Sequence, residues 1–269
     1  MRLSDIDPAL PLTPLDGRYR AQVAPLVDHL SEAALNRTRI VVETEWMIHL
    51  LDQGAIPGLR ALTDDERALL RRIPEDFGAE GIAEHAEIER ETVHDVKAVE
   101  YYIKRRLAGT SLAPLAEIVH IYCTSEDINN LSYALMVKGA LHDVWLPALT
   151  DLTADIAQLA RECADIPMLS RTHGQAATPT TLGKELAVFA YRLERQITRL
   201  RGDEILGKIN GATGTWAAHA ISVPDTDWPA IAKSFVEHLG LTWNPLTTQI
   251  ESHDWQAEIY SDVARAGRI

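Results

Sequence analysis

His173 lies in a polar stretch, S-R-T-H-G-Q-A-A-T-P-T-T-L-G-K-E at residues 170–185, whose side chains suit acid–base chemistry. Imidazole has a reference pKa of about 6.5, so histidine is the usual side chain for delivering or removing a proton near neutral pH. Gly174 gives the backbone beside His173 conformational freedom. A loop histidine can equally bond a backbone carbonyl, so the residues alone leave a catalytic and a structural interpretation open.

A second polar cluster, C-T-S-E-D-I-N-N-L-S, occupies residues 123–132. Thr124 and Asp127 have the spacing of a capping box, which explains them as a helix start without any ligand. Threonine, serine, two acids and two asparagines are more than a cap requires. The free N–H groups of a helix N-terminus also favour a carboxylate or phosphate. We therefore favour a binding role for Thr124 and Ser125.

Arg18 and Tyr19 follow a turn at Asp16–Gly17 in the motif T-P-L-D-G-R-Y. A guanidinium and a phenol side by side can bind a phosphate. A surface turn with a solvated arginine explains the same residues. Residue chemistry alone favours the surface turn.

Two further clusters are ambiguous from residue types alone. His94 and Asp95, in E-T-V-H-D-V-K, could orient an imidazole or contact ribose hydroxyls, or could form a solvated first helical turn. Gln249, in N-P-L-T-T-Q-I-E, could bond a ligand, but helping to cap the next helix is the favoured interpretation.

Composition and absent motifs narrow the function classes. The formal charge is −13, which argues against a general binder of nucleic acid or of an anionic membrane. There is no phosphate-binding loop, dinucleotide fingerprint or nucleophile elbow. The ten histidines include no H-E-x-x-H pattern, and the two cysteines are far apart. A metal site therefore has little support.

The cysteines and the N-terminal stretch favour a cytoplasmic protein. Cys123 and Cys163 are expected on helices as reduced core thiols rather than as a disulfide. Residues 1–20 carry acids and prolines where a secretory signal would be apolar. No run approaches the roughly 18 apolar residues of a membrane span.

Helical periodicity dominates the chain and predicts an all-α fold. Helices are expected near 24–53, 63–73 and 81–107, separated at Gly54, Pro57 and Pro74. A longer one is expected at about 125–163, bent by Pro147. Residues 111–117 suggest a junction, giving an N-terminal helical domain at 1–112 and a helix-bundle domain at 113–269.

The loop containing His173 is expected to lead directly into a helix at about 179–206. Thr178 is the predicted N-cap and Pro179 the first helical residue. An apolar stripe from Leu182 to Leu200 has helical period and predicts an antiparallel bundle with the 125–163 helix. A Gly-rich turn at 209–219, a short helix closed by Gly240 and a last helix from 251–254 to residue 269 complete the pattern.

Together the motifs resemble one family, adenylosuccinate lyase, in the mostly helical fumarase/aspartase superfamily. The resemblance extends from about residue 13 to the end and is carried by TPLDGRY, HDVKAVEYYIK, TSEDINNLSYALM, SRTHGQAATPTTLGKE, EILGKINGATG and WNPLTTQIE. It is closest to the bacterial branch in which HDVKAVEY and TSEDINNLS occur together. The resemblance implies a helix bundle of the fumarase/aspartase type.

The resemblance also implies a reaction and a set of roles. The reaction is a β-elimination that releases fumarate from adenylosuccinate, giving AMP, and from the succinylated carboxamide ribotide of purine synthesis. It implies a cytoplasmic homotetramer without metal or organic cofactor, binding a small purine nucleotide. His173 resembles the general acid that protonates the departing nitrogen. The residues that resemble substrate contacts are Arg18, Tyr19, Val93, His94, Asp95, Thr124, Ser125 and Gln249.

Three departures from the family pattern matter. Val93 replaces a polar residue such as asparagine, so any contact there would come from its backbone. Ala176 stands where proline is common. The family's signature loop, which carries the serine proposed as general base, has no counterpart before Ile269. We therefore expect the N-terminal portion of a lyase that is inactive or nearly inactive alone.

Two other functions are compatible with the same residues. A sibling lyase of the superfamily could release fumarate from another substrate, although a phosphate grip at T-P-L-D-G-R-Y would then be wasted. A non-catalytic helical scaffold could have kept the fold without the base. Retention of His173, Thr124–Ser125 and Arg18–Tyr19 argues against that scaffold.

Overall fold

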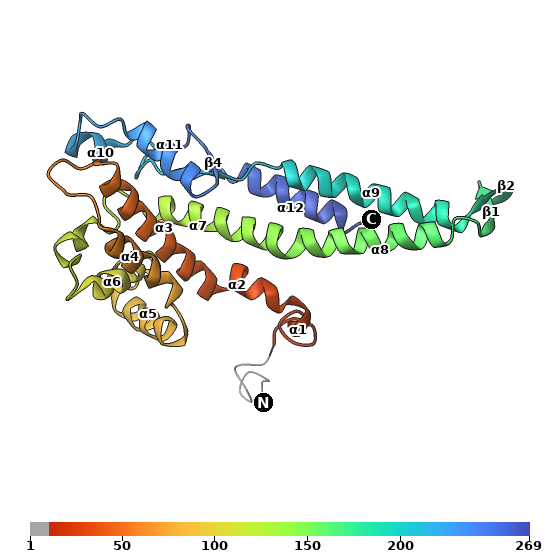
Figure 1. The fold of residues 1–269 in the computed structure, drawn as a ribbon, viewed down its shortest axis with the longest axis horizontal. Coiled ribbons are helices and arrows are strands. Elements are labelled where there is room, and N and C mark those ends of the chain that lie inside the picture. Colours follow the sequence, from red (N-terminus) through yellow and green to blue (C-terminus); the bar gives the residue numbers. More distant parts are fainter. Residues whose placement is uncertain (1–10) are drawn as a thin grey trace.

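The computed structural model describes residues 11–269 as an elongated, mostly helical chain (Figure 1). Short helices gather at one end of the long axis, and long helices run from there to a β-hairpin at the other end. The first ten residues, half of the stretch expected to lack a secretory signal, lie outside the described part. Within residues 11–269, no helix is both long enough and apolar enough to cross a membrane.

The N-terminal part follows the predicted helices but divides them further. Pro74, expected to break a helix, lies inside the helix Asp64–Glu75. The 24–53 segment breaks at Ser31, whose hydroxyl caps the next helix by accepting from the Ala34 N–H at 3.0 Å. The 81–107 segment breaks at Val93 and His94. The helices are α1 (Arg20–Val23), η2 (Ala24–Leu26), α2 (Val27–Leu30), α3 (Glu32–Asp52), α4 (Asp64–Glu75), α5 (Ala79–Thr92), α6 (Asp95–Leu107) and η3 (Ala113–Ile118).

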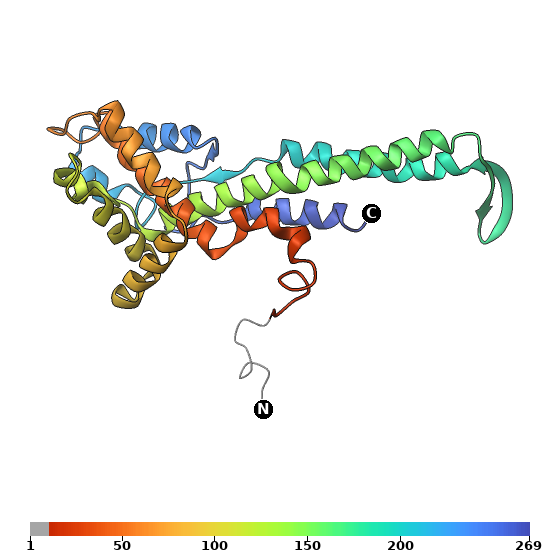
Figure 2. The ribbon, with the colours of Figure 1, turned by 60° about the horizontal axis from the view of Figure 1, so that its bottom comes forward.

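The predicted long helix at 125–163 is confirmed as α7 (Ser125–Gly139), a π-helical turn η4 (Ala140–Trp145) and α8 (Leu146–Glu162). The irregular turn lies just before Pro147, which lacks an N–H for the helical ladder. Helix α9 (Leu182–Gly202) runs back along α8, and α12 (Asp254–Ala266) packs beside α9 (Figure 2). The fold is therefore all-α in character, with an antiparallel bundle.

The apolar stripe of α9 is only half covered. Leu193, Ile197 and Leu200 are buried in the core, whereas Leu182 and Phe189, nearer the hairpin, are exposed. The core itself is one continuous cluster that reaches from Ile40 to Ile259. The division of the chain at residue 112 stays a prediction.

The structure corrects the prediction for residues 167–181. Instead of a loop and a helix start at Thr178–Pro179, the chain forms an antiparallel hairpin of β1 (Pro167–Thr172) and β2 (Gln175–Thr181). His173 (φ 51°) and Gly174 (φ 75°) form its two-residue turn. Positive φ at both turn residues matches the right-handed twist of paired strands. The polar alternation that signals a strand is missing because neither face of this hairpin is buried.

The N-cap of α9 is consequently Thr181 rather than Thr178. The Thr181 hydroxyl accepts from the Lys184 N–H at 3.1 Å. The Thr178 carbonyl instead accepts from the Ser170 hydroxyl across the hairpin. Pro179 fits in β2 because a two-stranded ribbon has edges that need no ladder N–H.

Four further elements lie between α9 and α12 in the chain. They are β3 (Leu206–Gly207), α10 (Ala217–Ser222), α11 (Trp228–His238) and β4 (Thr242–Trp243), with β3 and β4 paired in parallel. Gly240 ends α11 in the left-handed region (φ 73°), as predicted. Cys163 caps the end of α8, but Cys123 lies in a turn before α7, not on a helix, and both thiols are free.

Gly183 lets the bundle arm close at the hairpin. Its N–H donates to the Cys163 carbonyl at 2.9 Å, and a Cβ at this position would lie 2.2 Å from the Ala160 carbonyl oxygen. Helices α8 and α9 therefore meet backbone to backbone at this point. Only glycine allows so close an approach.

We expect Gly183→Ala to lower stability by about 1–3 kcal/mol, because the new methyl group must push the two helices apart. Thermal unfolding followed by circular dichroism would measure the loss. Gly202→Ala is the matched control, since nothing lies within 4 Å of its added Cβ. Equal melting temperatures for both variants would contradict the close-approach argument.

Candidate active site

The N-terminus of α7 presents Thr124 and Ser125, both half-buried. The backbone N–H of Thr124 donates to Asp127 Oδ2 at 2.9 Å, which is the carboxylate half of the predicted capping box. The Thr124 backbone is extended (φ −101°, ψ 158°), as an N-cap residue requires. The sequence therefore identified the start of α7 correctly.

Asp127 does more than cap the helix. Its Oδ1 accepts from Lys208 Nζ at 2.8 Å and from the Asn210 N–H at 2.9 Å, and its Oδ2 also accepts from the Gly211 N–H at 3.0 Å. Asp127 and Lys208 are both fully buried. Asn130 adds a further bond at 2.9 Å, from the Lys208 N–H to its Oδ1. The segment 206–211 is thereby fixed against α7.

The segment containing Gln249 lies beside this network. Gln249 is exposed, and its side-chain amide donates to the Ala212 carbonyl at 2.9 Å. Asn210 donates to the Thr247 hydroxyl at 2.6 Å. These bonds place Gln249 in the same region as Thr124 and Ser125.

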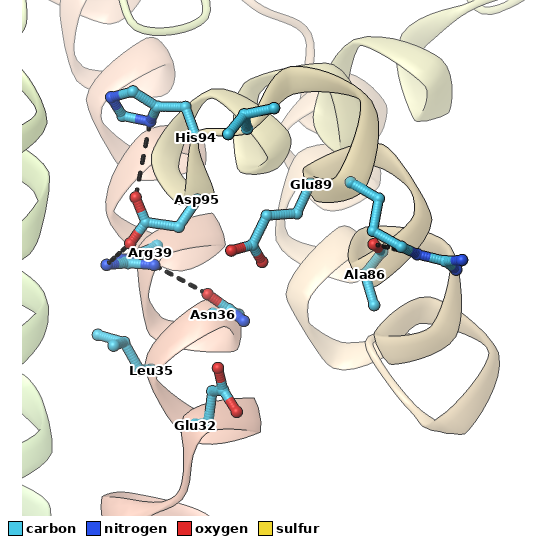
Figure 3. Close-up of a pocket in the computed structure, with 10 residues that line it drawn as sticks. Glu32, Leu35, Asn36, Arg39, Ala86, Glu89, His94 and Asp95 are labelled. Atoms are coloured by element: carbon cyan, nitrogen blue, oxygen red, sulfur yellow. Dashed lines mark hydrogen bonds and ion pairs between the residues drawn. The ribbon is translucent and has the colours of Figure 1, made fainter.

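His94 and Asp95 begin α6 and line a cavity of about 710 Å³ between α3 and α5 (Figure 3). His94 is the N-cap, and its Nδ1 accepts from the Lys97 N–H at 3.2 Å. The Asp95 carboxylate receives a bond from Arg39 at 2.7 Å. Burial raises the pKa of Asp95, but the Arg39 charge and hydrogen bonds to the carboxylate outweigh it, so the pKa lies below its ordinary value.

Arg39 connects the His94–Asp95 cluster to α7. Its guanidinium is 4% exposed and bonds Asn129 Oδ1 at 2.9 Å, one turn beyond Ser125. Sequence reasoning missed Arg39. A charged residue next to the apolar run I-V-V in α3 is the signal that could have identified it, because buried arginines are almost always paired.

Val93 lies at the C-terminus of α5 in the left-handed region (φ 53°) with its side chain 88% exposed. A β-branched residue in that conformation is strained. Its side chain lines the same cavity as His94 and Asp95. A polar side chain is absent at this position, as the sequence indicated.

His173 lies far from these clusters. It occupies the exposed tip of the β1–β2 hairpin, at the opposite end of the long axis from α5 and α6 in both views (Figures 1 and 2). One chain therefore does not bring His173 together with His94 and Asp95. The long α8 and α9 helices separate them.

Arg18 and Tyr19 are exposed just before α1. The turn ahead of them is ordered by Asp16, whose Oδ1 accepts from the Thr13 hydroxyl and from the Thr13 N–H, both at 2.7 Å. The Thr13 hydroxyl is the main cause, with backbone N–H groups, of an Asp16 pKa of about 2. Within residues 11–269, Arg18 and Tyr19 form no side-chain hydrogen bond or ion pair with the other predicted site residues.

A partly buried histidine, His120, and a fully buried one, His219, flank the candidate site and were not anticipated. His120 Nδ1 lies 2.6 Å from Glu43 Oε1 and its Nε2 lies 3.7 Å from Glu100. Burial lowers the His120 pKa, but these carboxylates outweigh it and raise the pKa above its ordinary value. His219 is fully buried against the rings of Tyr122 and Trp228, at 5.1 and 4.8 Å. Neither ring nitrogen of His219 has a hydrogen-bond partner in the part of the chain that the structure describes.

The thiol of Cys123, the residue before Thr124, is also shielded from solvent. Burial raises the pKa of Cys123 well above its ordinary value, and the nearby Asp127 carboxylate adds to the effect. The thiol form is therefore strongly favoured, which suits a structural cysteine rather than a nucleophile. Within residues 11–269, no group of three or more histidine, cysteine or acidic side chains could hold a metal ion.

Comparison with known proteins identifies the family. A family model described as "Lyase" matches residues 17–266. The chain belongs to this lyase family. It is 48% identical over 259 residues to the adenylosuccinate lyase of Escherichia coli K12, which covers 96% of this chain and 57% of that protein. The adenylosuccinate lyase of Haemophilus influenzae is 46% identical with the same coverage. The chain thus spans less than two thirds of these curated relatives.

Solved structures support the fold. A fumarate lyase from Mesorhizobium sp. BNC1 superposes with a TM-score of 0.72 at 20% identity, covering 90% of this chain and 54% of that one. A 3-carboxy-cis,cis-muconate lactonizing enzyme from Pseudomonas putida gives 0.69 at 21% identity, covering 89% and 52%. The expected fumarase/aspartase-type helical fold and the resemblance to adenylosuccinate lyases are confirmed.

We expect Asp127→Asn to cost about 3–5 kcal/mol, because it leaves the Lys208 ammonium buried without its counter-charge. Urea unfolding would measure the loss in free energy of unfolding. Asp151→Asn on the exposed side of α8 removes the same charge and is the control. A loss no larger than the control's would show that Lys208 finds another partner.

His219 generates a prediction about pH. Burial lowers its pKa from 6.5 to about 4, so the unfolded chain binds a proton that the folded chain rejects. The stabilising contribution of neutral His219 is present above the unfolded pKa and is lost as pH falls toward the folded value. Between about pH 7 and pH 4 the loss amounts to about 3 kcal/mol.

His219→Phe keeps an aromatic ring between Tyr122 and Trp228 and removes the titration. We expect its free energy of unfolding to fall less steeply with acid than that of the unaltered chain. Urea titrations at several pH values would compare the two slopes. If the free energies of unfolding of the two proteins fell equally steeply with acid, His219 would already be protonated or solvated in the folded chain.

Proposed function

We propose that this chain supplies part of an adenylosuccinate lyase active site, one that releases fumarate from adenylosuccinate to give AMP. The same reaction would act on the succinylated carboxamide ribotide of purine synthesis. The observation that carries the proposal is 48% identity to the Escherichia coli enzyme over 96% of this chain. The candidate site residues lie in the motifs that resemble the family. We also propose a cytoplasmic location.

The chemistry requires a general base, fixed donors and an acid. The base that takes the proton is proposed, by resemblance, to be the serine of the family's signature loop, which is not among residues 1–269. Removing a proton beside a carboxylate places negative charge on that carboxylate, so fixed donors aimed at it lower the barrier. Thr124 and Ser125 are the proposed donors at the N-terminus of α7. As the C–N bond breaks, its electron pair goes to nitrogen, and His173 is the proposed acid that protonates this atom. No step calls for a metal or an organic cofactor.

His94 and Asp95 are proposed to bind the substrate at the cavity beside α5, with Val93 contributing its backbone. Arg18, Tyr19 and Gln249 are the remaining proposed contacts, to phosphate, ribose or succinyl groups. Arg39 holds Asp95 at 2.7 Å, so it fixes the carboxylate that would face a ligand.

The distance between His173 and this cavity supports an assembly of several chains. Because α8 and α9 hold His173 away from His94, we propose that His173 of one chain serves the site of another, in a homotetramer. An apolar groove of about 520 Å³ on α8, α9 and α12 supports association. Trp145, Leu149 and the exposed Phe189 line it. Large exposed apolar grooves commonly mark interfaces.

We expect the purified chain to bind AMP, and His94→Ala to weaken binding about tenfold or more by removing a hydrogen bond to the ligand. Isothermal titration calorimetry would measure both affinities. His142→Ala, on the exposed side of η4, is the matched control. Failure of the unaltered chain to bind AMP would contradict the proposal and favour a sibling lyase or a scaffold.

Fumarate release from adenylosuccinate tests the arrangement of the site. A preparation shown to be monomeric by light scattering is expected to release none, since His173 and His94 lie at opposite ends of one chain and the proposed base is not among residues 1–269. Turnover by the monomer that disappears in His173→Ala would overturn the proposal that His173 acts on another chain.

A further inference from the structure

Glu251 shapes the segment between Gln249 and α12. Its carboxylate is almost fully buried and accepts three hydrogen bonds. These come from the His253 N–H at 2.7 Å, the Trp255 indole at 3.1 Å and the Asn244 amide at 2.9 Å. The turn from Asn244 to Trp255 is therefore fixed around one acidic side chain.

His253 is held by this turn in an unusual backbone conformation. It is the residue before α12 and lies in the left-handed region (φ 61°). Its Nδ1 is 3.6 Å from Glu251 Oε2, while its Nε2 points to α7 and lies 3.4 Å from Glu126 Oε1. The strained backbone thus turns the imidazole toward the start of α7.

The side chains of Glu126 and His253 are both partly withdrawn from solvent. The Glu126 side chain is 16% exposed and that of His253 is 32% exposed. Among the residues that the structure describes, Glu126 Oε1 and His253 Nδ1 are buried without a hydrogen bond. Burial raises the pKa of Glu126, although His253 and Lys208 act against this effect. The ammonium of Lys208 is itself bound by Asp127.

The position of the two residues links both halves of the candidate site. Glu126 directly follows Thr124 and Ser125 on α7. His253 lies four residues beyond Gln249, on the segment that leads into α12. No other ion pair within residues 11–269 joins these two segments.

We propose that Glu126 and His253 form a positioning pair, which holds the Gln249 segment against Thr124 and Ser125 and makes nucleotide binding depend on pH. The inference rests on the proposed function for its ligand, AMP. The attraction requires an ionised Glu126 and a proton on His253 Nε2, which faces Glu126 Oε1. Because burial raises the pKa of Glu126, the attraction is lost as pH falls through that raised value.

Stability and binding should therefore respond to pH in opposite directions. A raised folded pKa means that neutral Glu126 suits the fold better, so its contribution to stability is present at low pH and is lost as pH rises. Glu126→Gln should raise the melting temperature at neutral pH. It should at the same time weaken AMP binding. A merely structural pair would not separate the two effects.

Thermal unfolding of four proteins tests the pair itself: the unaltered chain, Glu126→Gln, His253→Asn and the double variant. Asparagine tolerates the left-handed region, so His253→Asn keeps the turn. Without His253 the buried carboxylate is more costly, so Glu126→Gln should raise the melting temperature more in the His253→Asn background, by a few degrees. Equal increases in both backgrounds would overturn the pair.

Calorimetric titration of AMP from about pH 5 to pH 8 tests the positioning role. Each single variant should bind AMP about three- to tenfold more weakly at neutral pH, and the double variant no more weakly than either. Glu126→Gln should also lose the acid-side fall in affinity of the unaltered chain. Asp254→Asn removes a neighbouring exposed charge. It should change neither the AMP affinity at neutral pH nor the dependence of that affinity on pH.

The outcomes separate the two proposals. Thermal coupling with unchanged AMP affinity would overturn the positioning role and leave the proposed function intact. No AMP binding by the unaltered chain would overturn the proposed function and the nucleotide part of this inference. The thermal comparison would still decide whether Glu126 and His253 attract one another.

Discussion

The buried carboxylate of Asp127 is the interaction on which the rest of the structure depends. It closes the first turn of α7, neutralises Lys208 and receives the backbone N–H groups of Asn210 and Gly211. A fully buried charge pair is costly unless its hydrogen bonds are complete. In this network both Asp127 oxygens have two donors each. The same carboxylate therefore orders a helix start, a loop and their contact.

From this fixed base the molecule extends in one direction. Helices α7 and α8 lead away from the base, the hairpin reverses the chain, and α9 returns beside α8 (Figure 1). Gly183 permits the close contact where the return begins. Most of the candidate binding residues therefore lie at the end of the molecule where α7 begins. The candidate acid, His173, lies at the distant hairpin tip. The proposed function assigns substrate binding to the first region and proton transfer to the second.

Local signals predicted much of this fold, and non-local ones did not. The start of α7, the closure of α11 by Gly240 and the long helical stripe of α9 depend on residues a few positions apart, so one sequence was enough. The hairpin was missed because its exposed faces lack apolar alternation. The Asp127–Lys208 pair was missed because 81 positions separate its partners. Arg39 was missed for the same reason, since its partner Asp95 lies 56 positions away.

The lengths of α8 and α9 set how far the hairpin tip lies from the start of α7. Each residue of an α-helix advances the chain by about 1.5 Å, so removing seven residues from both α8 and α9 would shorten the arm by about 10 Å. Such a paired deletion would nearly preserve the packing register between the helices, because seven residues make close to two turns. It would nevertheless move the His173 tip inward without altering any residue of the base. The number of helical turns between Gly139 and the hairpin therefore determines where His173 is presented.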